Sequence, residues 1–239
     1  REDLARLRGS AVTDAELNAS IAVYNDNRAA VRDLYAYRAA KPWQAPTSEV
    51  YLVQRAGMVL PVEEHTALVR QYLAAAEKLS RPKRDNARVV LTGGFCEQPP
   101  LALIKSIEMA GCYVVDDDFM LVGRWLLDHV PTDGDPLAEL SKAFLHRSAT
   151  TAAKYEATRE EKGVFLMKQV KTRGAEGVVF AAPSFCDPAL LERPMLQDVL
   201  SKHAIPHTAF KYAENTGQMA PIREQAGTFA DSIKLWSAA

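Results

Sequence analysis

The cysteines are the residues of this sequence with the most distinctive chemistry. There are three of them, Cys96, Cys112 and Cys186. Thiolates bind soft metal ions and iron–sulfur clusters, whereas a free cysteine that binds nothing is commonly a small buried hydrophobe. Residue type alone leaves both roles open. The odd, low count argues against a disulfide framework and predicts a reducing compartment, which we expect to be the cytoplasm.

Two of these cysteines come shortly after segments that are predicted to be β-strands. Short apolar runs predict strands at residues 88–92, 113–115, 178–181 and 207–212. In an open parallel sheet, ligands bind outside the carboxyl ends of the strands. We therefore expect Cys96 and Cys186 at that edge, where either is a candidate metal ligand. Cys112 begins its strand, so we expect it at the opposite edge and in the core.

Amphipathic segments alternate with these strands and predict the helices that connect them. The expected helices are 101–110, 119–129, 137–145, 152–173 with a break near Gly163, 188–203 and 221–236. Regular alternation of strands and helices is typical of α/β proteins. We therefore predict that residues 87–239 form a mostly parallel sheet with helices on both faces.

The first part of the chain is predicted to be a helical segment that precedes the sheet. Helices are expected over 1–40 and 62–79, with a linker that begins at Pro42 and Pro46. Thr13 and Glu16 form the capping-box pattern of a helix start within the first of these helices. We divide the chain into a helical segment with its linker, 1–86, and an α/β domain, 87–239, in which we expect any cluster or substrate site to lie.

Three consecutive aspartates, Asp116, Asp117 and Asp118, follow the expected strand at 113–115. Carboxylates bind magnesium and act as general acids or bases. The alternative is a turn that is exposed to solvent, which we expect for at least one of the three. No residue of the sequence can be assigned as catalytic from its type and spacing.

Composition and motifs exclude several classes of protein. The net charge is -1, without the basic excess that marks a nucleic-acid surface. The apolar runs are far shorter than the roughly 20 residues of a membrane-spanning helix, so we expect no membrane segment. The sequence contains no phosphate-binding loop, and we do not expect this chain itself to hydrolyse ATP.

Four short segments and one longer stretch are similar to a known family. The segments are Thr92-Gly93-Gly94, Val114 to Phe119, Phe185-Cys186-Asp187 and Gly217 to Gln225, and the longer stretch is Gly227 to Trp236. They resemble the cluster-binding subunits of the benzoyl-CoA reductase and 2-hydroxyacyl-CoA dehydratase family. The longer stretch is most similar to the benzoyl-CoA reductase branch, and the resemblance covers nearly the whole chain.

The resemblance implies an oxidoreductase of anaerobic aromatic degradation. It implies that the chain is part of a 4Fe–4S subunit of an ATP-dependent aryl-CoA (benzoyl-CoA) reductase, which passes low-potential electrons to a CoA thioester. The implied partners are a homologous cluster-binding subunit, an ATP-hydrolysing activator and an aryl- or acyl-CoA substrate. The implied cofactor is a 4Fe–4S cluster.

The resemblance also implies roles for single residues. Cys186 matches the family's C-terminal cluster ligand, and Cys96 is a second candidate ligand without a firm counterpart. The candidates to hydrogen-bond a cluster through their backbone amides are Gly93, Gly94, Ser184 and Phe185.

Family members carry a further N-terminal domain with additional cluster cysteines. We therefore expect this chain to be the C-terminal portion of a subunit, with the remaining cluster ligands supplied elsewhere. Two alternatives stay open. One is a subunit of a 2-hydroxyacyl-CoA dehydratase, and the other is a non-catalytic α/β scaffold subunit whose cysteines are merely buried.

Overall fold

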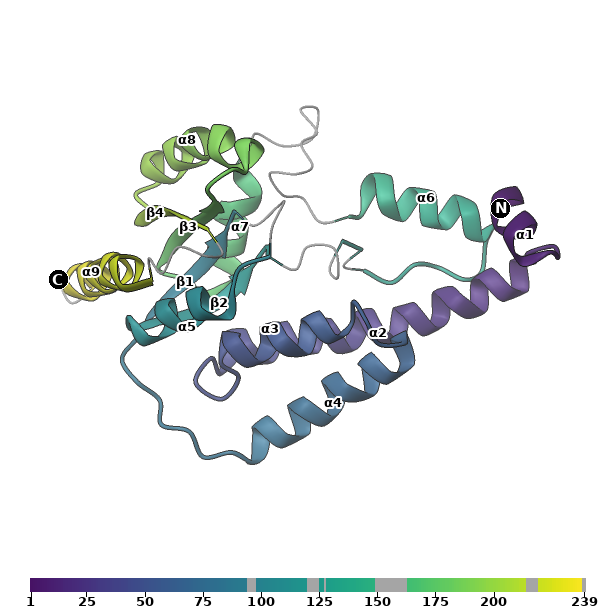
Figure 1. Cartoon of the computed structure of the whole chain (residues 1–239), viewed down its shortest axis with the longest axis horizontal. Helices are drawn as coiled ribbons and strands as arrows, with labels where there is room; N and C mark the ends of the chain where they lie inside the picture. Colours follow the sequence, from purple (N-terminus) through teal and green to yellow (C-terminus); the bar gives the residue numbers. More distant parts are fainter. Residues whose placement is uncertain (94–97, 120–124, 127, 149–162, 214–218, 238–239) are drawn as a thin grey trace.

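A sheet of parallel strands forms the centre of the protein. The computed structural model describes residues 1–93, 98–119, 125–126, 128–148, 163–213 and 219–237 (Figure 1). The strands are β1 (Ala87–Thr92), β2 (Cys112–Asp117), β3 (Gly177–Pro183) and β4 (His207–Tyr212). They form a four-stranded sheet in the order β2-β1-β3-β4, and every pair is parallel. The predicted fold class is confirmed.

The strand order places a topological switch point between β1 and β3. The chain passes from β1 to its neighbour β2, and later returns to add β3 on the other side of β1. The loops that follow β1 and β3 therefore leave the sheet in opposite directions. In open α/β sheets, such a switch point opens a crevice at the carboxyl ends of the strands, and ligands bind there.

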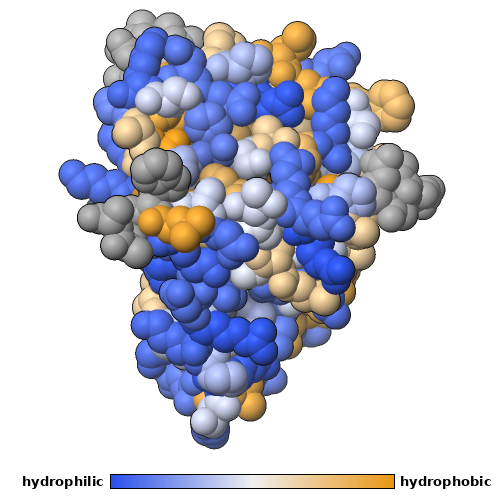
Figure 2. Space-filling view, turned by 90° about the vertical axis from the view of Figure 1, so that its left-hand side faces the viewer, coloured by the Kyte–Doolittle hydropathy of each residue, from blue (hydrophilic) through white to orange (hydrophobic). Residues whose placement is uncertain are grey.

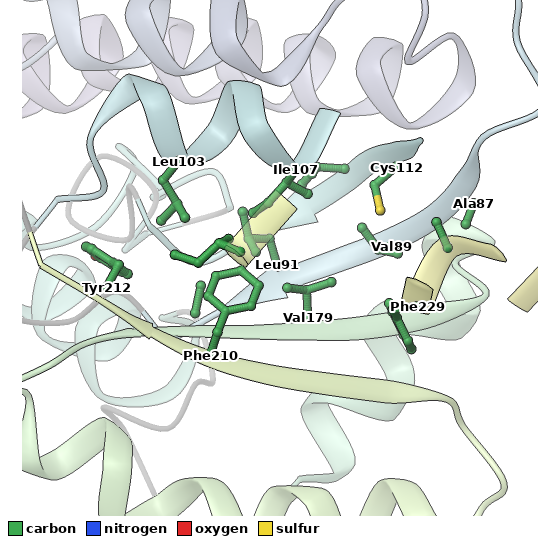
Figure 3. Packing of buried hydrophobic residues seen from close by; sticks show 14 of the residues in the cluster. Ala87, Val89, Leu91, Leu103, Ile107, Cys112, Val179, Phe210, Tyr212 and Phe229 are labelled. Atoms are coloured by element: carbon green, nitrogen blue, oxygen red, sulfur yellow. The ribbon is translucent and has the colours of Figure 1, made fainter. Parts of the chain in front are cut away.

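Helices cover both faces of the sheet because successive strand side chains point to opposite sides. Val89 and Leu91 belong to a buried cluster with α5 (Leu101–Met109) and α9 (Met219–Ser237), as Figure 3 shows for part of that cluster. The intervening Val90 belongs to a second cluster, on the other face. That cluster includes residues of α7 (Val164–Arg173) and α8 (Asp187–Lys202).

The N-terminal helices are α1 (Glu2–Arg8), α2 (Asp14–Ala40), α3 (Thr47–Ala56) and α4 (Val62–Lys78). Of these, α2, α3 and α4 lie side by side below the sheet in Figure 1, and α1 lies at the right-hand end of α2. The predicted capping box is confirmed, because the Thr13 hydroxyl accepts from the Glu16 amide and the Glu16 carboxylate accepts from the Thr13 amide. Leu34 and Tyr35 of α2 pack with Val50 of α3 and Val69 of α4 in a separate buried cluster.

The linker predicted after Pro46 is wrong over residues 47–56, where the chain forms α3. Pro46 is the N-cap of that helix, a place where proline's missing amide costs little. The buried residues of α3 are Thr47, Val50, Tyr51 and Gln54. Their spacing matches one face of a helix, so the prolines mark the start of a helix rather than a loop.

The helix predicted over 119–129 is also wrong in its described part. Leu126 forms an isolated antiparallel bridge with Ser148. The backbone of Val130 is held by Asn25 of α2, whose side chain donates to the carbonyl at 2.8 Å and accepts from the amide at 2.9 Å. These contacts join the segment to α2 and to the end of α6 (Pro136–His146), and they override its helical pattern.

The described surface carries mixed side chains. On the face shown in Figure 2, hydrophilic residues predominate and hydrophobic residues lie among them. Within the described ranges, none of the helices combines the length and the apolar character that crossing a bilayer requires.

Candidate functional site

The loop after β3 is tied to the end of β4. The amide and the hydroxyl of Ser184 both donate to the carbonyl oxygen of Tyr212, at 2.8 Å and 3.0 Å. The next residue, Phe185, is 92% exposed, whereas Cys186 is 1% exposed. The structure thus places these residues at the carboxyl edge of the sheet, beside the switch point, where Cys186 was predicted.

Cys186 is the N-cap of α8, and its amide donates to the Pro183 carbonyl at 3.1 Å. Its side chain packs with Ala182 and Ala189 in a small buried cluster. The first amides of a helix have no intrahelical acceptor and carry a partial positive charge, which favours an anion nearby. Burial does not separate a metal ligand from a packed thiol, since cluster ligands are also shielded from water.

Gly93 connects the loops after β1 and β2. Its amide donates to both carboxylate oxygens of Asp118, at 3.0 Å and 3.2 Å. The hydroxyl of Thr92 donates to the same carboxylate at 2.5 Å. Gly93 has a φ of 118°, and a Cβ added there would lie 2.9 Å from the Ala181 carbonyl oxygen of β3. Glycine therefore lets the loop turn and approach β3 closely.

We expect Gly93→Ala to destabilise the protein by about 1–3 kcal/mol, because alanine is strained at this φ and its Cβ meets the β3 backbone. The free energy of unfolding, measured by urea titration of the full-length subunit, tests this. Gly134→Ala is the control, since its Cβ would meet nothing closer than 3.5 Å, and we expect a change within about 0.5 kcal/mol. Equal effects of the two substitutions would contradict the role of Gly93.

The three aspartates do not form an exposed turn, which corrects the prediction made for at least one of them. Asp116 and Asp117 belong to β2, and the exposed fractions of Asp116, Asp117 and Asp118 are 2%, 5% and 6%. A bulge at Val115 shifts the register between β1 and β2. The partner of Val90 is therefore Asp116, where a regular ladder would have placed Val115. This shift directs Asp116 toward the face that α7 covers.

Two arginines from distant parts of the chain neutralise the carboxylates of Asp116 and Asp117. Arg38 of α2 donates to Asp117 at 2.7 Å and lies 3.8 Å from Asp116. Arg173, the last residue of α7, donates to Asp116 at 2.7 Å. The Tyr35 hydroxyl donates to Asp117 at 3.3 Å, and its ring lies 4.4 Å below the Arg38 guanidinium.

These ion pairs and hydrogen bonds join the helical segment to the sheet. We call the group the Arg38 cluster; its members are Arg38, Asp116, Asp117, Arg173 and Tyr35. Arg38 is 0% exposed. Burial by itself lowers the pKa of Arg38. The nearby carboxylates of Asp117 and Asp116 raise this pKa by more than burial lowers it, so the pKa of Arg38 lies above its ordinary value. The cluster is a buried ion-pair network. The cluster was not predicted from the sequence, because no local pattern links its members. Arg38 and Asp117 are 79 positions apart, and Asp116 and Arg173 are 57 positions apart.

Cys112 lies where it was predicted. It begins β2 opposite Ala87, at the amino edge of the sheet, and is 1% exposed. Figure 3 shows its side chain beside Ala87 and Val89. Burial raises the pKa of the Cys112 thiol to about 12, so very little thiolate forms near neutral pH. This cysteine has the properties of a core residue.

The carboxyl edge is where an iron–sulfur site was predicted. Cys186 follows β3 there at the start of α8, Ser184 and Phe185 precede it, and Gly93 follows β1 on the other side of the switch point. Gly94 and Cys96 lie outside the described residues. A 4Fe–4S cluster is commonly held by four cysteines, and among the residues that the structure describes no three metal-binding side chains come together. Cys186 therefore fits as one ligand of a site that needs others.

Comparison with known proteins decides the family. A family model described as 2-hydroxyglutaryl-CoA dehydratase, D-component, matches residues 1–233. The chain belongs to this family. The match confirms the resemblance found in the sequence, and it runs through the helical segment, the Arg38 cluster and the loop that contains Cys186.

Three relatives match along nearly all of this chain. It is 62% identical over 237 residues to one of the subunits of the benzoyl-CoA reductase of Thauera aromatica, covering 99% of this chain and 61% of that protein. It is 24% identical to the (R)-phenyllactyl-CoA dehydratase beta subunit of Clostridium sporogenes, and this match covers 97% of this chain and 61% of that protein. It is 25% identical to the beta subunit of the lactoyl-CoA dehydratase of Anaerotignum propionicum, covering 98% and 62%. The chain thus spans less than two thirds of these relatives.

Proposed function

We propose that this chain is part of a 4Fe–4S subunit of an ATP-dependent benzoyl-CoA reductase, in which low-potential electrons pass to an aryl-CoA thioester. The observation that carries the proposal is the place of Cys186, at the carboxyl end of β3, beside the switch point and at the start of α8. The identity of 62% to a benzoyl-CoA reductase subunit supports the aryl-CoA substrate.

Each residue of the carboxyl edge has a role in this proposal. Cys186 would bind one iron of the cluster, which when bound supplies electrons of low potential. The amides of Ser184 and Gly93, which were predicted to bond to a cluster, already donate to the Tyr212 carbonyl and to the Asp118 carboxylate, so among the described residues the amide of Phe185 is the remaining candidate donor to cluster sulfur. Hydrogen bonds to the sulfurs are one of the factors that set the potential of a cluster. Asp118 would fix the Gly93 loop through its two hydrogen bonds. Gly94 and Cys96 remain candidates of the same site.

The proposed partners are those that the family resemblance implies, a homologous cluster-binding subunit and an ATP-hydrolysing activator. The subunit names of the relatives support a complex of several subunits, and the lack of a phosphate-binding loop in this chain agrees with ATP hydrolysis by a separate protein. Cys186 alone does not complete a ligand set, so the other ligands would come from Cys96 or from other segments of the complete subunit.

A dehydratase subunit is the second candidate, and it is favoured by the two relatives that are named dehydratases. Their identities of 24% and 25% are much lower than 62%, which places this candidate second. A scaffold subunit with buried cysteines is the third, and the packing of Cys186 among alanines is compatible with it without separating it from the other two.

Anaerobic purification of the full-length subunit with its partner tests the proposal. We expect bound iron and sulfide, and broad absorption near about 400 nm from the thiolate-bound cluster. With the activator and ATP, benzoyl-CoA should gain hydrogen, whereas a dehydratase would remove water from a 2-hydroxyacyl-CoA. Product masses separate these two outcomes. A colourless complex without iron would favour the scaffold.

A further inference from the structure

A cavity of about 440 Å³ lies within the helical segment, against the segment that contains Trp125. Its wall is formed by α2, by the end of α3 and the turn that follows, by α4, and by Trp125 and Leu126. None of these elements belongs to the loops at the carboxyl edge. The volume falls within the range of about 300–1,000 Å³ that is typical of small-molecule sites.

The wall contains one arginine without an anionic partner among the described residues. Arg28 of α2 donates through Nη2 to the Asn25 side chain at 2.7 Å, which is a neutral acceptor. In the part of the chain that the structure describes, its Nε is buried and bonds to nothing. Burial, and then repulsion by Arg32, lower the pKa of Arg28. A half-buried guanidinium in this state gains stability when an anion pairs with it.

Two further polar atoms of the wall are buried and unpaired within the described residues. They are Nε1 of Trp125, a donor, and Oε1 of Gln54, an acceptor. Gln54 is only 2% exposed. Buried polar groups nearly always have hydrogen-bond partners. Two donors, Arg28 Nε and Trp125 Nε1, thus belong to residues that line one cavity, and neither has a partner among the described residues.

Trp125 and Leu126 both contact residues at or just after the C-terminal end of α6. The ring of Trp125 lies 6.0 Å from that of Phe144, and Leu126 bridges to Ser148. Asn25 binds the backbone of Val130 and also orients Arg28. One buried side chain therefore fixes both the arginine and the segment that faces it.

The remaining lining fixes the character of the ligand. His65 is not free to bind it, since its Nδ1 lies 2.9 Å from the Asn27 amide and its Nε2 lies 3.1 Å from the Val53 carbonyl. Burial lowers the pKa of His65, so the ring stays neutral near pH 7. No carboxylate is among the described lining residues, and the rest of the wall is largely apolar, with Met58, Leu60, Val62 and Leu126.

We propose that this cavity binds a small organic carboxylate with an apolar body. In this proposal the carboxylate accepts from the guanidinium of Arg28 and the indole N–H of Trp125, both of which belong to residues that line the cavity. The apolar body packs against Leu60, Val62 and Leu126. The ligand thereby pairs the arginine charge, for which the described wall residues offer no carboxylate.

Isothermal titration of the full-length subunit in its complex tests the proposal, with benzoate as the probe and benzamide as its neutral isostere. We expect benzoate to bind with a Kd of about 1 mM or tighter, a value reasonable for so small a molecule. Benzamide should bind at least about tenfold more weakly, because hydrogen bonds to charged groups are the stronger ones.

Variants locate the binding. Arg28→Gln should weaken benzoate binding by roughly ten- to a hundredfold. Arg70→Gln is the control, because Arg70 lies on α4, its side chain is 56% exposed and it does not line the cavity, and it should leave the Kd unchanged. Equal binding of benzoate and benzamide, or no binding of either, would overturn the proposal even if the Arg28 variant fails to fold.

The titration requires neither a cluster nor turnover. An absence of benzoate binding in a complex that contains iron and reduces benzoyl-CoA would therefore refute the carboxylate cavity and leave the proposed function intact. Benzoate binding by a complex that contains no iron would support the carboxylate cavity and contradict the proposed function.

Discussion

Cys186→Ser in the full-length subunit is expected to remove or convert the cluster and to abolish reduction of the CoA thioester. A serine hydroxyl stays protonated near neutral pH and binds iron poorly beside a thiolate. The substitution is nearly isosteric, so the packing with Ala182 and Ala189 should survive. Iron content and the electron paramagnetic resonance of the reduced protein measure the loss, and benzoyl-CoA turnover measures its consequence.

Cys112→Ser is the matched control, because Cys112 is equally buried but lies at the opposite edge of the sheet. We expect it to keep its iron and to lose only about 1–3 kcal/mol of stability, the cost of burying a hydroxyl in an apolar cluster. Full iron and turnover in the Cys186 variant, together with loss of both in the Cys112 variant, would reverse the assignment.

Arg38→Met should have the largest effect on stability, about 3–5 kcal/mol. Methionine fills much of the same space but leaves Asp117 buried without its cation, at a site where Arg38 is 0% exposed. Urea titration of the full-length subunit measures the loss. Arg70→Met is the control, since Arg70 and Asp26 form an ion pair whose side chains are 56% and 53% exposed, and it should cost less than about 1 kcal/mol.

A double variant separates loss of charge pairing from loss of packing. In Arg38→Met with Asp117→Asn, the uncompensated carboxylate is gone, and Asp116 keeps Arg173 as its partner. We expect the double variant to regain much of the stability lost by Arg38→Met alone. If the second substitution adds a further loss instead, the cost of Arg38→Met is one of packing and not of charge.

The sheet could be predicted from the sequence because its strands are nearly continuous apolar runs. Residues 177–183 are buried throughout, as expected for a central parallel strand. The prediction failed where tertiary contacts outweigh local pattern. The segment around Leu126 has a helical pattern but is held by a bridge to Ser148. Pro46 was taken as the start of a linker, although proline is equally suited to precede a helix.

The candidate site was predictable in its position but not in its partners. Cys186 could be placed at the carboxyl edge because it directly follows an apolar strand. The burial of Asp116 and Asp117 depends on a bulge at Val115 and on arginines that are distant in the sequence. A single sequence contains no signal for either, and three aspartates in a row are ordinarily expected to be solvated.

The Arg38 cluster also limits how this chain can exchange parts with its relatives. A chimera that takes residues 1–86 from one relative and the rest from another separates Arg38 from Asp116 and Asp117. If the donor helix has no cation at this place, the recipient sheet keeps two buried carboxylates with Arg173 as their only remaining partner among the cluster's arginines. In this chain the helical segment and the end of β2 therefore form a matched pair, even though they are distant in the sequence.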